Sequence, residues 1–445
     1  MNKELLDLAQ DTLSRVMKLG ATAADATVVE RRDSSISIRQ GVVEELEQSE
    51  AREIGLRVFA GQSSALIAGS VLTPEARQRL AERALHMAKL APPDPFAGLA
   101  APEQLAKAEL DLDLVSKTFP TAADLRRLAE EAEQIALAVK GVSKSSGASA
   151  SSSMSDIALA SSNGFAKSYQ RTGFGLSVGV IAGEGTGMVR DFDGTSANHF
   201  SDLETPHKVG TTAGERAVKR LNPQKLASQA VPVIYDRRVA SSLLGHLAGA
   251  INGAGIARGV SFLKDRLGQQ IFAPGVTVID DPHRLRGLAS KSYDGEGLPT
   301  SRRAFIDKGV LTSWVLDLRS ARQLNLQSTG SASRGLASQP SPSTTNFHME
   351  PGAQTPEDLI KSLSKGLLVT EFIGASINSA TGDYSRGASG FWIENGEVQF
   401  PVSEITVAGN LIEMFAHLTP ANDLQFRSST NAPSCLIEGM TLAGR

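Results

Sequence analysis

The stretch that decides the fold spans residues 156–185 and reads DIALASSNGFAKSYQRTGFGLSVGVIAGEG. Apolar residues alternate with other residues on both sides of Asn163 and Gly164, and this alternation is typical of half-buried β-strands. An Asn-Gly pair between two such runs is a strong hairpin signal, because both residues tolerate a positive φ. The sequence therefore predicts an antiparallel hairpin that turns at this pair.

The segment that leads into this hairpin is rich in serine. Residues 143–156 read SKSSGASASSSMSD, a composition that is typical of a flexible tether when it is taken alone. The segment nevertheless continues directly into the alternating run, and small polar residues can occupy strand positions. We therefore expect it to belong to the sheet.

A second set of alternating residues lies between positions 26 and 70. Ile36 and Ile38, and later Ile54, Leu56 and Val58, recur with period two, as expected for strands of a meander with one buried face. Helical segments with capping signals flank these strands. They are residues 1–20, which end at Gly20, residues 74–90 after Thr73, and the segment that follows Thr121 and ends at Gly141.

The second half of the chain alternates short helical segments with glycine-punctuated strands. A strand at 231–236 leads into a glycine-rich helix at 241–259, a helix capped by Thr355 ends at Gly366, and the rest up to residue 410 is largely strand-like. Residues 329–345 form a loop that is long enough for a lid or is simply mobile. We predict an α+β fold. Its domains are residues 1–222, with a linker at about 91–104, and a larger strand-rich domain at 231–445 that contains the glycine-lined helix.

Composition restricts the classes of function. The chain has 445 residues, 41% hydrophobic and 21% charged, and a formal net charge of −3, which gives no electrostatic reason to expect nucleic acid or an anionic membrane as a partner. No apolar run is long enough for a membrane span, and the first residues lack the continuous apolar core of a signal peptide. The only cysteine, Cys435, excludes an intrachain disulfide framework. We expect a cytoplasmic protein.

The glycine-rich helix raises the question of a metal site. Leu243, Leu244 and Leu247 give it one apolar face, while glycines at 245, 249 and 253 line another. Each glycine lowers helix propensity by roughly 1 kcal/mol relative to alanine, so close packing or a site is expected to offset the loss. His246 stands alone in this segment, and a single histidine cannot hold a metal.

Self-sufficient catalytic motifs are absent from the sequence. No histidine is followed by glutamate, so the zinc motif H-E-x-x-H is missing. The segment GASG at 387–390 does not have the spacing of a G-x-S-x-G nucleophile elbow, and no phosphate-binding loop occurs. What remains are polar clusters between glycines: Asp294 and Glu296 in YDGEG, and Asp383, Tyr384 and Arg386 in GDYSRG.

These polar clusters suit a peptide-binding surface. Glycines allow backbone amides to approach a ligand, and Arg386 can bind a peptide carboxylate through two hydrogen bonds. Alternatively, Arg386 pairs with Asp383 and holds the turn. Strand-rich edges with such polar rims are compatible with a peptide that binds by strand addition.

Three segments carry a resemblance to a known family. They are GHLAGAINGAG at 245–255, SYDGEGLPTSRRAFIDKGVLTSWVLDLRSARQLNLQSTG at 292–330 and TGDYSRGASGFWIENGEVQFPVSEITVAGNL at 381–411. They closely resemble the PmbA/TldE branch of the TldD/PmbA family, and the similarity covers nearly the whole chain. The resemblance implies a cytoplasmic bacterial protein that pairs with a TldD-like subunit. The pair would form a metallopeptidase that acts on unfolded or small peptides such as microcin precursors and an antitoxin.

The resemblance also predicts what this chain lacks. In the TldD branch the corresponding helix carries H-E-x-x-x-H, and zinc is bound by both histidines and a more distant cysteine. By this resemblance those three helix positions are Gly245, His246 and Ala250 here, and the cysteine position is Ala432 rather than Cys435. The resemblance therefore implies no metal ligand and no catalytic residue in this chain, with zinc expected in the TldD-like partner.

We accordingly predict the non-catalytic subunit of a heteromeric zinc metallopeptidase. Without its TldD-like partner the chain could also form a homodimer, and the sequence does not decide between a homodimer and a monomer. The substrate-binding candidates are His246, Asp294, Glu296, Asp383, Tyr384 and Arg386. Two alternatives stay open. One is an autonomous hydrolase that uses His246 and Cys435 or an unrecognised serine. The other is a regulatory protein-binding module, because older names in the family refer to modulation of DNA gyrase.

Overall fold

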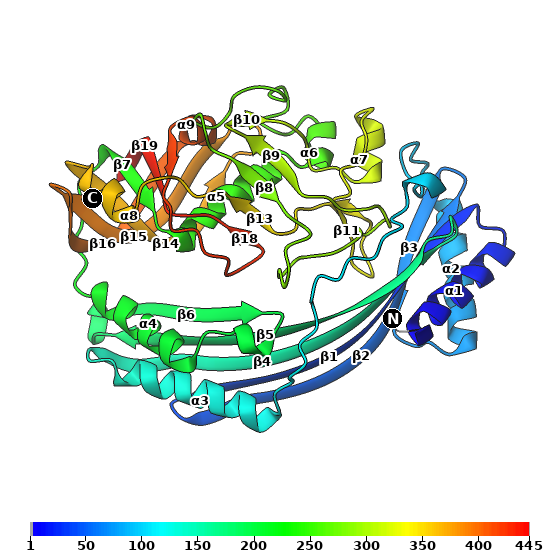
Figure 1. Ribbon diagram of the computed structural model, residues 1–445, viewed down its shortest axis with the longest axis horizontal. Helices are drawn as coiled ribbons and strands as arrows, with labels where there is room; N and C mark the ends of the chain where they lie inside the picture. The colour runs from blue at the N-terminus through cyan, green and yellow to red at the C-terminus, as the bar shows by residue number, and fades with distance from the viewer. Residues whose placement is uncertain (1–2, 445) are drawn as a thin grey trace.

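The first half of the chain forms a six-stranded antiparallel sheet, which is the lower curved layer in Figure 1. The computed structural model describes residues 3–444. The strand order is β3-β2-β1-β4-β5-β6. The strands are β1 (Ala23–Arg39), β2 (Val42–Ala60), β3 (Ser63–Gly69), β4 (Val142–Ser161), β5 (Ala166–Ala182) and β6 (Val189–Ala197). The predicted hairpin is the β4–β5 pair, and its turn holds Gly164 at a φ of +98°.

The serine-rich segment is strand β4, as predicted, and its side chains explain why. Even-numbered residues such as Ala148 and Ala150 are buried under helices. Odd-numbered serines lie on the other face, where the Oγ atoms of Ser149 and Ser177 are 2.9 Å apart. A Cβ added at Gly173 would lie 2.8 Å from Ser153 Oγ. The facing positions of β4 and β5 therefore have room for small residues.

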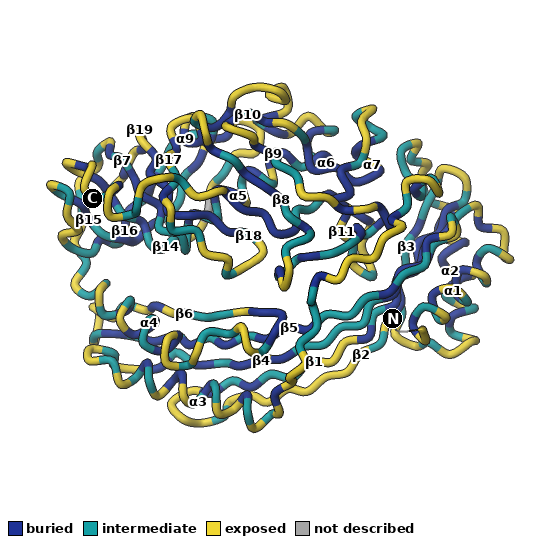
Figure 2. The backbone as a smooth tube through the Cα atoms, in the orientation of Figure 1, coloured by how far each residue is buried: buried dark blue, intermediate teal, exposed yellow. Residues whose placement is uncertain are grey.

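Four helices cover the convex face of this sheet. They are α1 (Lys3–Lys18), α2 (Pro74–Leu90), α3 (Ala122–Ala138) and α4 (Pro206–Lys219). Thr73 and Thr121 cap α2 and α3 through their side-chain oxygens, as the sequence predicts. The helices pack in two pairs on alternate residues of the strands and bury two separate hydrophobic clusters. The opposite, concave face of the sheet faces the C-terminal half (Figure 2).

The second half of the chain is built on a closed barrel. The sheet order is β16-β15-β14-β7-β19-β17, and a further pairing between β16 and β19 closes it. The strands are β7 (Gln229–Tyr235), β14 (Lys365–Ile377), β15 (Asp383–Glu394), β16 (Glu397–Asn410), β17 (Leu418–Pro420) and β19 (Cys435–Ala443). Helix α5 (Arg237–Ala250) directly follows β7, and its apolar face joins the largest hydrophobic core of the molecule.

Short elements complete this half. A five-stranded sheet has the order β10-β9-β8-β13-β18. Its strands are β8 (Val278–Asp280), β9 (Arg303–Asp307), β10 (Val310–Leu311), β13 (Phe347–Met349) and β18 (Thr430–Asn431). Two further strands, β11 (Ala332–Ser333) and β12 (Ser341–Pro342), pair with each other. The short helices are α6 (Gly253–Ala257), α7 (Leu318–Gln323), α8 (Pro356–Lys361) and α9 (Leu411–Ala416). The mixture of antiparallel sheets and separate helices confirms the α+β prediction.

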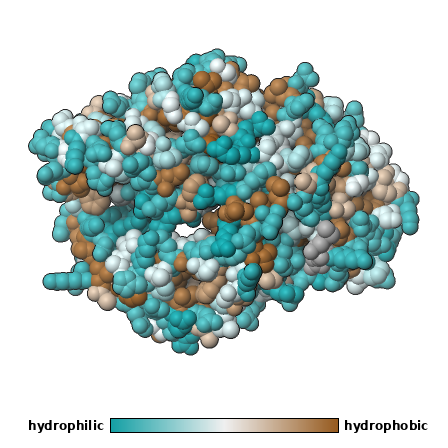
Figure 3. All heavy atoms as spheres, viewed as in Figure 1, coloured by the Kyte–Doolittle hydropathy of each residue, from teal (hydrophilic) through white to brown (hydrophobic). Residues whose placement is uncertain are grey.

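The two halves face each other across the concave side of the first sheet. Ion pairs join them at both ends: Arg238 to Asp191 at 2.8 Å, Arg427 to Glu204 at 2.5 Å, and Arg334 to Asp25 at 2.6 Å. Figure 3 shows an opening between the sheet and the C-terminal half. The chain between α2 and α3 runs along this boundary (Figure 1), where Arg286 binds Asp113.

Three local expectations need correction. The loop at 329–345 is a packed segment that contains the β11–β12 pair, and a Cβ added at Gly55 would lie 2.3 Å from the Leu336 carbonyl oxygen. The glycine-rich helix is interrupted at Ile251 and Asn252, because Asn252 caps the separate helix α6. Helix α8 ends at Lys361, since β14 begins at Lys365 and takes up the residues before the predicted end at Gly366.

Among the residues that the structure describes, no helix is both long and apolar enough to cross a membrane.

Candidate functional site

Helix α5 holds the first candidate residue, and the structure fixes its orientation. Asp236 directly follows strand β7 and caps the helix by accepting a hydrogen bond from Arg238 N. Leu243, Leu244 and Leu247 are fully buried in the core. The helix thereby turns a second face away from the core.

This second face is open rather than closely packed. Gly245 and Gly249 are exposed, and a Cβ added at either would meet nothing within 4 Å. Of the two explanations expected for the glycines, close packing or a site, close packing within this chain does not apply to Gly245 and Gly249. It holds only at Gly253, where an added Cβ would lie 2.5 Å from Leu316 Cδ2. The propensity cost of the two exposed glycines is not offset by packing within this chain.

His246 lies on α5 beside an aromatic residue of strand β15. Its ring is 5.7 Å from that of Tyr384 in an edge-to-face arrangement. Its Nε2 atom is buried and has no hydrogen-bond partner within the described part of the chain. Burial, followed by the charge of Arg386, lowers the pKa of His246 to about 4. The imidazole is therefore neutral at physiological pH, and one of its nitrogens is buried without a partner.

Tyr384 and Arg386 continue this cluster. The Tyr384 hydroxyl is 3.2 Å from that of Tyr235 on β7, and burial raises the pKa of Tyr384. The Arg386 guanidinium lies 4.4 Å from the centre of the Phe372 ring, and its Nε donates to the Gly374 carbonyl oxygen at 2.9 Å. We call His246, Tyr384, Arg386, Tyr235 and Phe372 the aromatic–arginine cluster.

Asp383 is not part of this cluster. It is exposed, and its carboxylate accepts hydrogen bonds from Thr381 Oγ1 at 2.6 Å and from Asn410 Nδ2 at 3.2 Å. Residues three apart on a strand point to opposite faces, and the two side chains have different partners: Thr381 and Asn410 for Asp383, and Gly374 and the Phe372 ring for Arg386. The alternative in which Arg386 holds the turn by pairing with Asp383 is therefore wrong, because Asp383 holds it through Thr381 and Asn410.

Asp294 and Glu296 lie in a different place, at the boundary between the two halves. The Asp294 carboxylate accepts hydrogen bonds from three backbone N–H groups, those of Glu296, Leu298 and Ala332, at 2.9–3.0 Å. Glu296 accepts from Leu318 N at 2.8 Å and is 3.8 Å from Arg57. Burial, together with the charge of Asp294, raises the pKa of Glu296 to about 8. Both carboxyl groups hold loops in place.

The residues on α5 do not fit a zinc ion. Gly245 and Ala250 offer no donor atom, and His246 faces the cation of Arg386. Cys435 is fully buried, its Sγ lies 3.2 Å from the Pro433 carbonyl oxygen, and burial raises the pKa of the thiol. No three potential ligands come together among the described residues, whereas a catalytic zinc site requires three.

Sequence reasoning missed Tyr235 and Phe372. Tyr235 lies in an apolar strand where nothing distinguishes it from a core residue, and its partner Tyr384 is 149 positions away in the sequence. Phe372 is identified only because Arg386, on the adjacent strand, lies over its ring. Neither contact leaves a local signal in the sequence.

Comparison with protein families agrees with this architecture. Three family models match: PmbA/TldA metallopeptidase domain 1 over residues 24–88, the central domain over 117–221, and the C-terminal domain over 228–444. Together they cover most of the chain. The chain belongs to the PmbA/TldD metallopeptidase family. This confirms the resemblance that the sequence motifs indicate.

Relatives in the family match over their full length. The metalloprotease PmbA of Escherichia coli O157:H7 is 38% identical over 445 residues, which are 100% of this chain and 97% of the relative. A PmbA homologue of Haemophilus influenzae is 35% identical, over 99% and 96% of the two chains.

Solved structures share the fold. A Bacteroides thetaiotaomicron protein described as a candidate modulator of DNA gyrase has a TM-score of 0.91 at 28% identity and covers 99% of this chain and 98% of its own. TldE of Thermococcus kodakarensis has a TM-score of 0.85 at 21% identity, over 98% and 99%; at this identity the likeness concerns the fold alone.

Proposed function

We propose that this chain is the non-catalytic, TldE-type subunit of a heteromeric zinc metallopeptidase in the cytoplasm. A TldD-like subunit would hold the zinc and the catalytic glutamate, and the pair would process or degrade unfolded peptides such as a microcin precursor or an antitoxin. Membership of the metallopeptidase family supports the reaction class.

One observation carries the assignment of a non-catalytic role. The family resemblance aligns the metal-motif helix of the TldD branch with α5 of this chain, and this alignment puts Gly245, His246 and Ala250 at the three motif positions. With no second imidazole and a buried thiol in Cys435, this chain does not supply the ligand set that zinc hydrolysis requires. The same observation argues against an autonomous peptidase.

The aromatic–arginine cluster would then contact the substrate. A neutral His246 with an unpartnered Nε2 can exchange a hydrogen bond with a peptide group, and Arg386 can attract a carboxylate or a carbonyl oxygen. Gly245 and Gly249 leave space beside them. In this role the cluster positions an extended peptide but moves no proton in the reaction.

Peptide cleavage tests the proposal. The chain alone, a TldD-like subunit from the same cell, and their mixture are each incubated with an unstructured fluorogenic peptide. We expect cleavage by the mixture and none by this chain alone. Cleavage by this chain alone that is lost in His246→Ala would contradict the proposal and support the autonomous hydrolase.

A matched pair of variants tests the role of the cluster in the mixture. His246→Ala is expected to raise KM with little change in kcat, because the side chain would contact the peptide but not the reacting atoms. His207→Ala removes an exposed histidine on α4 and is expected to change neither value. Equal kinetics for the two variants would remove His246 from the binding site.

A further inference from the structure

A cavity of about 460 Å³ lies between the two halves, away from the aromatic–arginine cluster. Its floor is the concave face of strands β1, β4 and β5, with Thr27, Ile157 and Arg171 among the lining residues. Its roof comes from two segments of the C-terminal half, residues 288–295 and 332–345. Exposed Ser333 and Gly335 form part of its wall, so the cavity reaches the molecular surface there.

The charged groups that line this cavity are mainly basic. Arg171, Lys291 and Arg334 line it, while Asp294 is its only acidic lining residue in the described chain. The charge of Asp294 acts on Lys291, but its oxygens accept three backbone N–H groups and form no hydrogen bond with the three cations among the described residues. Among the described residues, Lys291 Nζ donates to the Ala332 carbonyl oxygen alone, at 3.0 Å, and an ammonium group has three donors.

Several donors in the lining have no partner. The Nε and Nη2 atoms of Arg334, the hydroxyl of Tyr293 and Oγ1 of Thr27 are buried without a hydrogen bond within the described residues. The Arg334 side chain is only 4% exposed, and its Nη1 alone is paired, with Asp25. Leaving buried donors unsatisfied is costly, and a guanidinium with two free donor groups is suited to a second group with paired oxygens.

We propose that this interdomain cavity is a binding site for the carboxylate of a small amphipathic acid, namely the C-terminal carboxylate of a short peptide. Arg334, Lys291 and Arg171 would surround the carboxylate, with Tyr293 and Thr27 as hydroxyl donors. The identification of the acid as a peptide rests on the proposed function, because a peptidase complex generates new peptide carboxylates as it cleaves.

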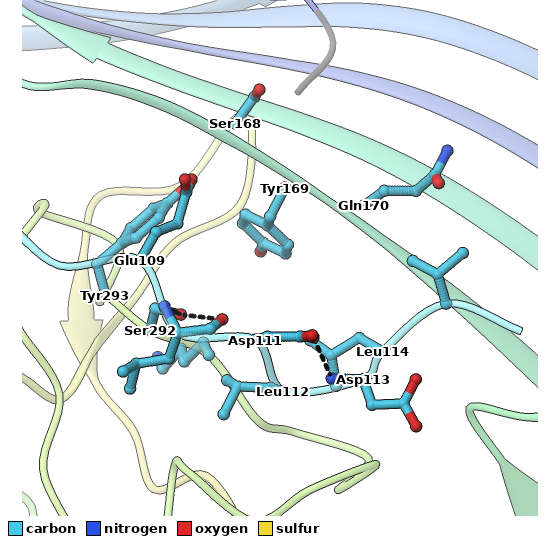
Figure 4. Close-up of a pocket in the computed structure, with 13 residues that line it drawn as sticks. Glu109, Asp111, Leu112, Asp113, Leu114, Ser168, Tyr169, Gln170, Ser292 and Tyr293 are labelled. Atoms are coloured by element: carbon cyan, nitrogen blue, oxygen red, sulfur yellow. Dashed lines mark hydrogen bonds between the residues drawn. The ribbon is translucent and has the colours of Figure 1, made fainter.

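The remaining walls favour a peptide over a bare anion. Val29, Ile157 and Leu159 on the floor and Leu288 and Leu336 on the roof are apolar, and they can contact one or two apolar side chains. The volume is of the size that holds small organic ligands rather than a single ion. A second, smaller cavity of about 240 Å³ shares Tyr169, Lys291 and Tyr293 and is lined by residues 109–115 (Figure 4).

Binding to the full chain without a partner subunit tests the proposal. The probes are N-acetyl-leucyl-leucine, its C-terminal amide and inorganic phosphate, each titrated by calorimetry. We expect the acid to bind about tenfold or more tightly than the amide, because only the acid carries the charge. Equal binding of acid and amide would overturn the proposal. Phosphate that binds as tightly as the acid would overturn the assignment of the ligand as a peptide carboxylate.

Variants locate the site within the molecule. Lys291→Gln is expected to weaken binding of the acid about tenfold. Lys264→Gln removes the same charge from an exposed position outside the cavity and is expected to have no effect. Equal affinities for these two variants would overturn the proposal.

A more conservative variant tests the same site if Lys291→Gln does not fold. Tyr293→Phe removes a hydroxyl that has no partner in the chain, so it should fold normally while binding the acid several-fold more weakly. Unchanged binding of the acid in Tyr293→Phe would overturn the proposal that the acid binds at this hydroxyl. These titrations do not depend on cleavage, so their failure is distinguishable from failure of the proposed function.

Discussion

At the scale of single residues, the environment of His246 decides how this chain differs from a metal-binding relative. A histidine that served as a ligand would have its nitrogens directed at a metal and oriented by a hydrogen bond. His246 instead packs against Tyr384 and faces a cation from Arg386. Its neutral state follows from burial and from this charge.

The titration of His246 follows directly. Its pKa is lowered to about 4 from an ordinary value of 6.5, so between these values the unfolded chain binds a proton that the folded chain does not. The contribution of His246 to the free energy of unfolding therefore decreases as the pH falls from 6.5 toward 4. NMR titration of the histidine ring protons, assigned with His246→Asn, is expected to give a value well below 6.5. A value of 6.5 or higher would show that the ring is solvated or paired.

At the scale of elements, the sequence predicts strands and helices best where the periodicity of apolar residues agrees with the turn and helix-capping residues. The alternating residues of β4 and β5 and the Asn163-Gly164 turn are sufficient for the hairpin, and Thr73 and Thr121 are sufficient for two helix starts. The barrel could not be predicted, because β7 pairs with β14 and β19, which are distant in the sequence. Period-two patterns identify strands but not their neighbours.

The glycines of the C-terminal half show that local sequence pattern also fails to reveal the surroundings of residues at the candidate site. Gly249 and Gly253 are four positions apart and look equivalent in sequence. One is exposed with open space around it, and the other lies against Leu316 and Ser320. Which of them needs to be glycine depends on α7 and the segment before it, not on local pattern. The candidate site was predicted in part for this reason: His246, Tyr384 and Arg386 come together, while Asp294 and Glu296 lie at the boundary between the halves.

This difference gives a paired prediction. Gly249→Ala is expected to raise the free energy of unfolding by up to about 1 kcal/mol, because alanine has the higher helix propensity and the site is open. Gly253→Ala is expected to lower it, since the new methyl group would lie within 2.8 Å of Ser320 Oγ and the Val315 carbonyl oxygen. Urea denaturation of both variants measures the two changes, and changes of the same sign would contradict the packing described for α5 and α6.

At the scale of the whole molecule, buried charges hold the C-terminal half over the concave sheet. Asp25 on β1 is shared by Arg57 and Arg334, which come from different halves of the chain. Glu296 lies beside Arg57 and also fixes the start of α7 through Leu318 N. Removing one member of such a buried group is generally more destabilising than removing an exposed ion pair. The relative position of the halves thus depends on the ionisation of a few side chains.

Glu296 makes this dependence measurable. Its pKa is raised to about 8 from an ordinary value of 4.5, so the folded chain holds an extra proton between these values, and this contribution to stability is lost as the pH rises through 8. Glu296→Gln mimics the protonated form and is expected to flatten the dependence of the unfolding free energy on pH between 6 and 9. Glu103→Gln, outside this network, is the control. An unchanged slope in Glu296→Gln would show that Glu296 is ionised in the folded protein.

The zinc content of the purified chain is the measurement that tests the central claim most directly. The chain and a TldD-like subunit are each equilibrated with zinc and freed of unbound metal. The zinc content of each is then measured by elemental mass spectrometry. We expect far less than one zinc per molecule of this chain and about one per molecule of the partner, because α5 lacks the required ligands. One zinc per molecule of this chain, lost in His246→Ala, would contradict the assignment of a non-catalytic subunit.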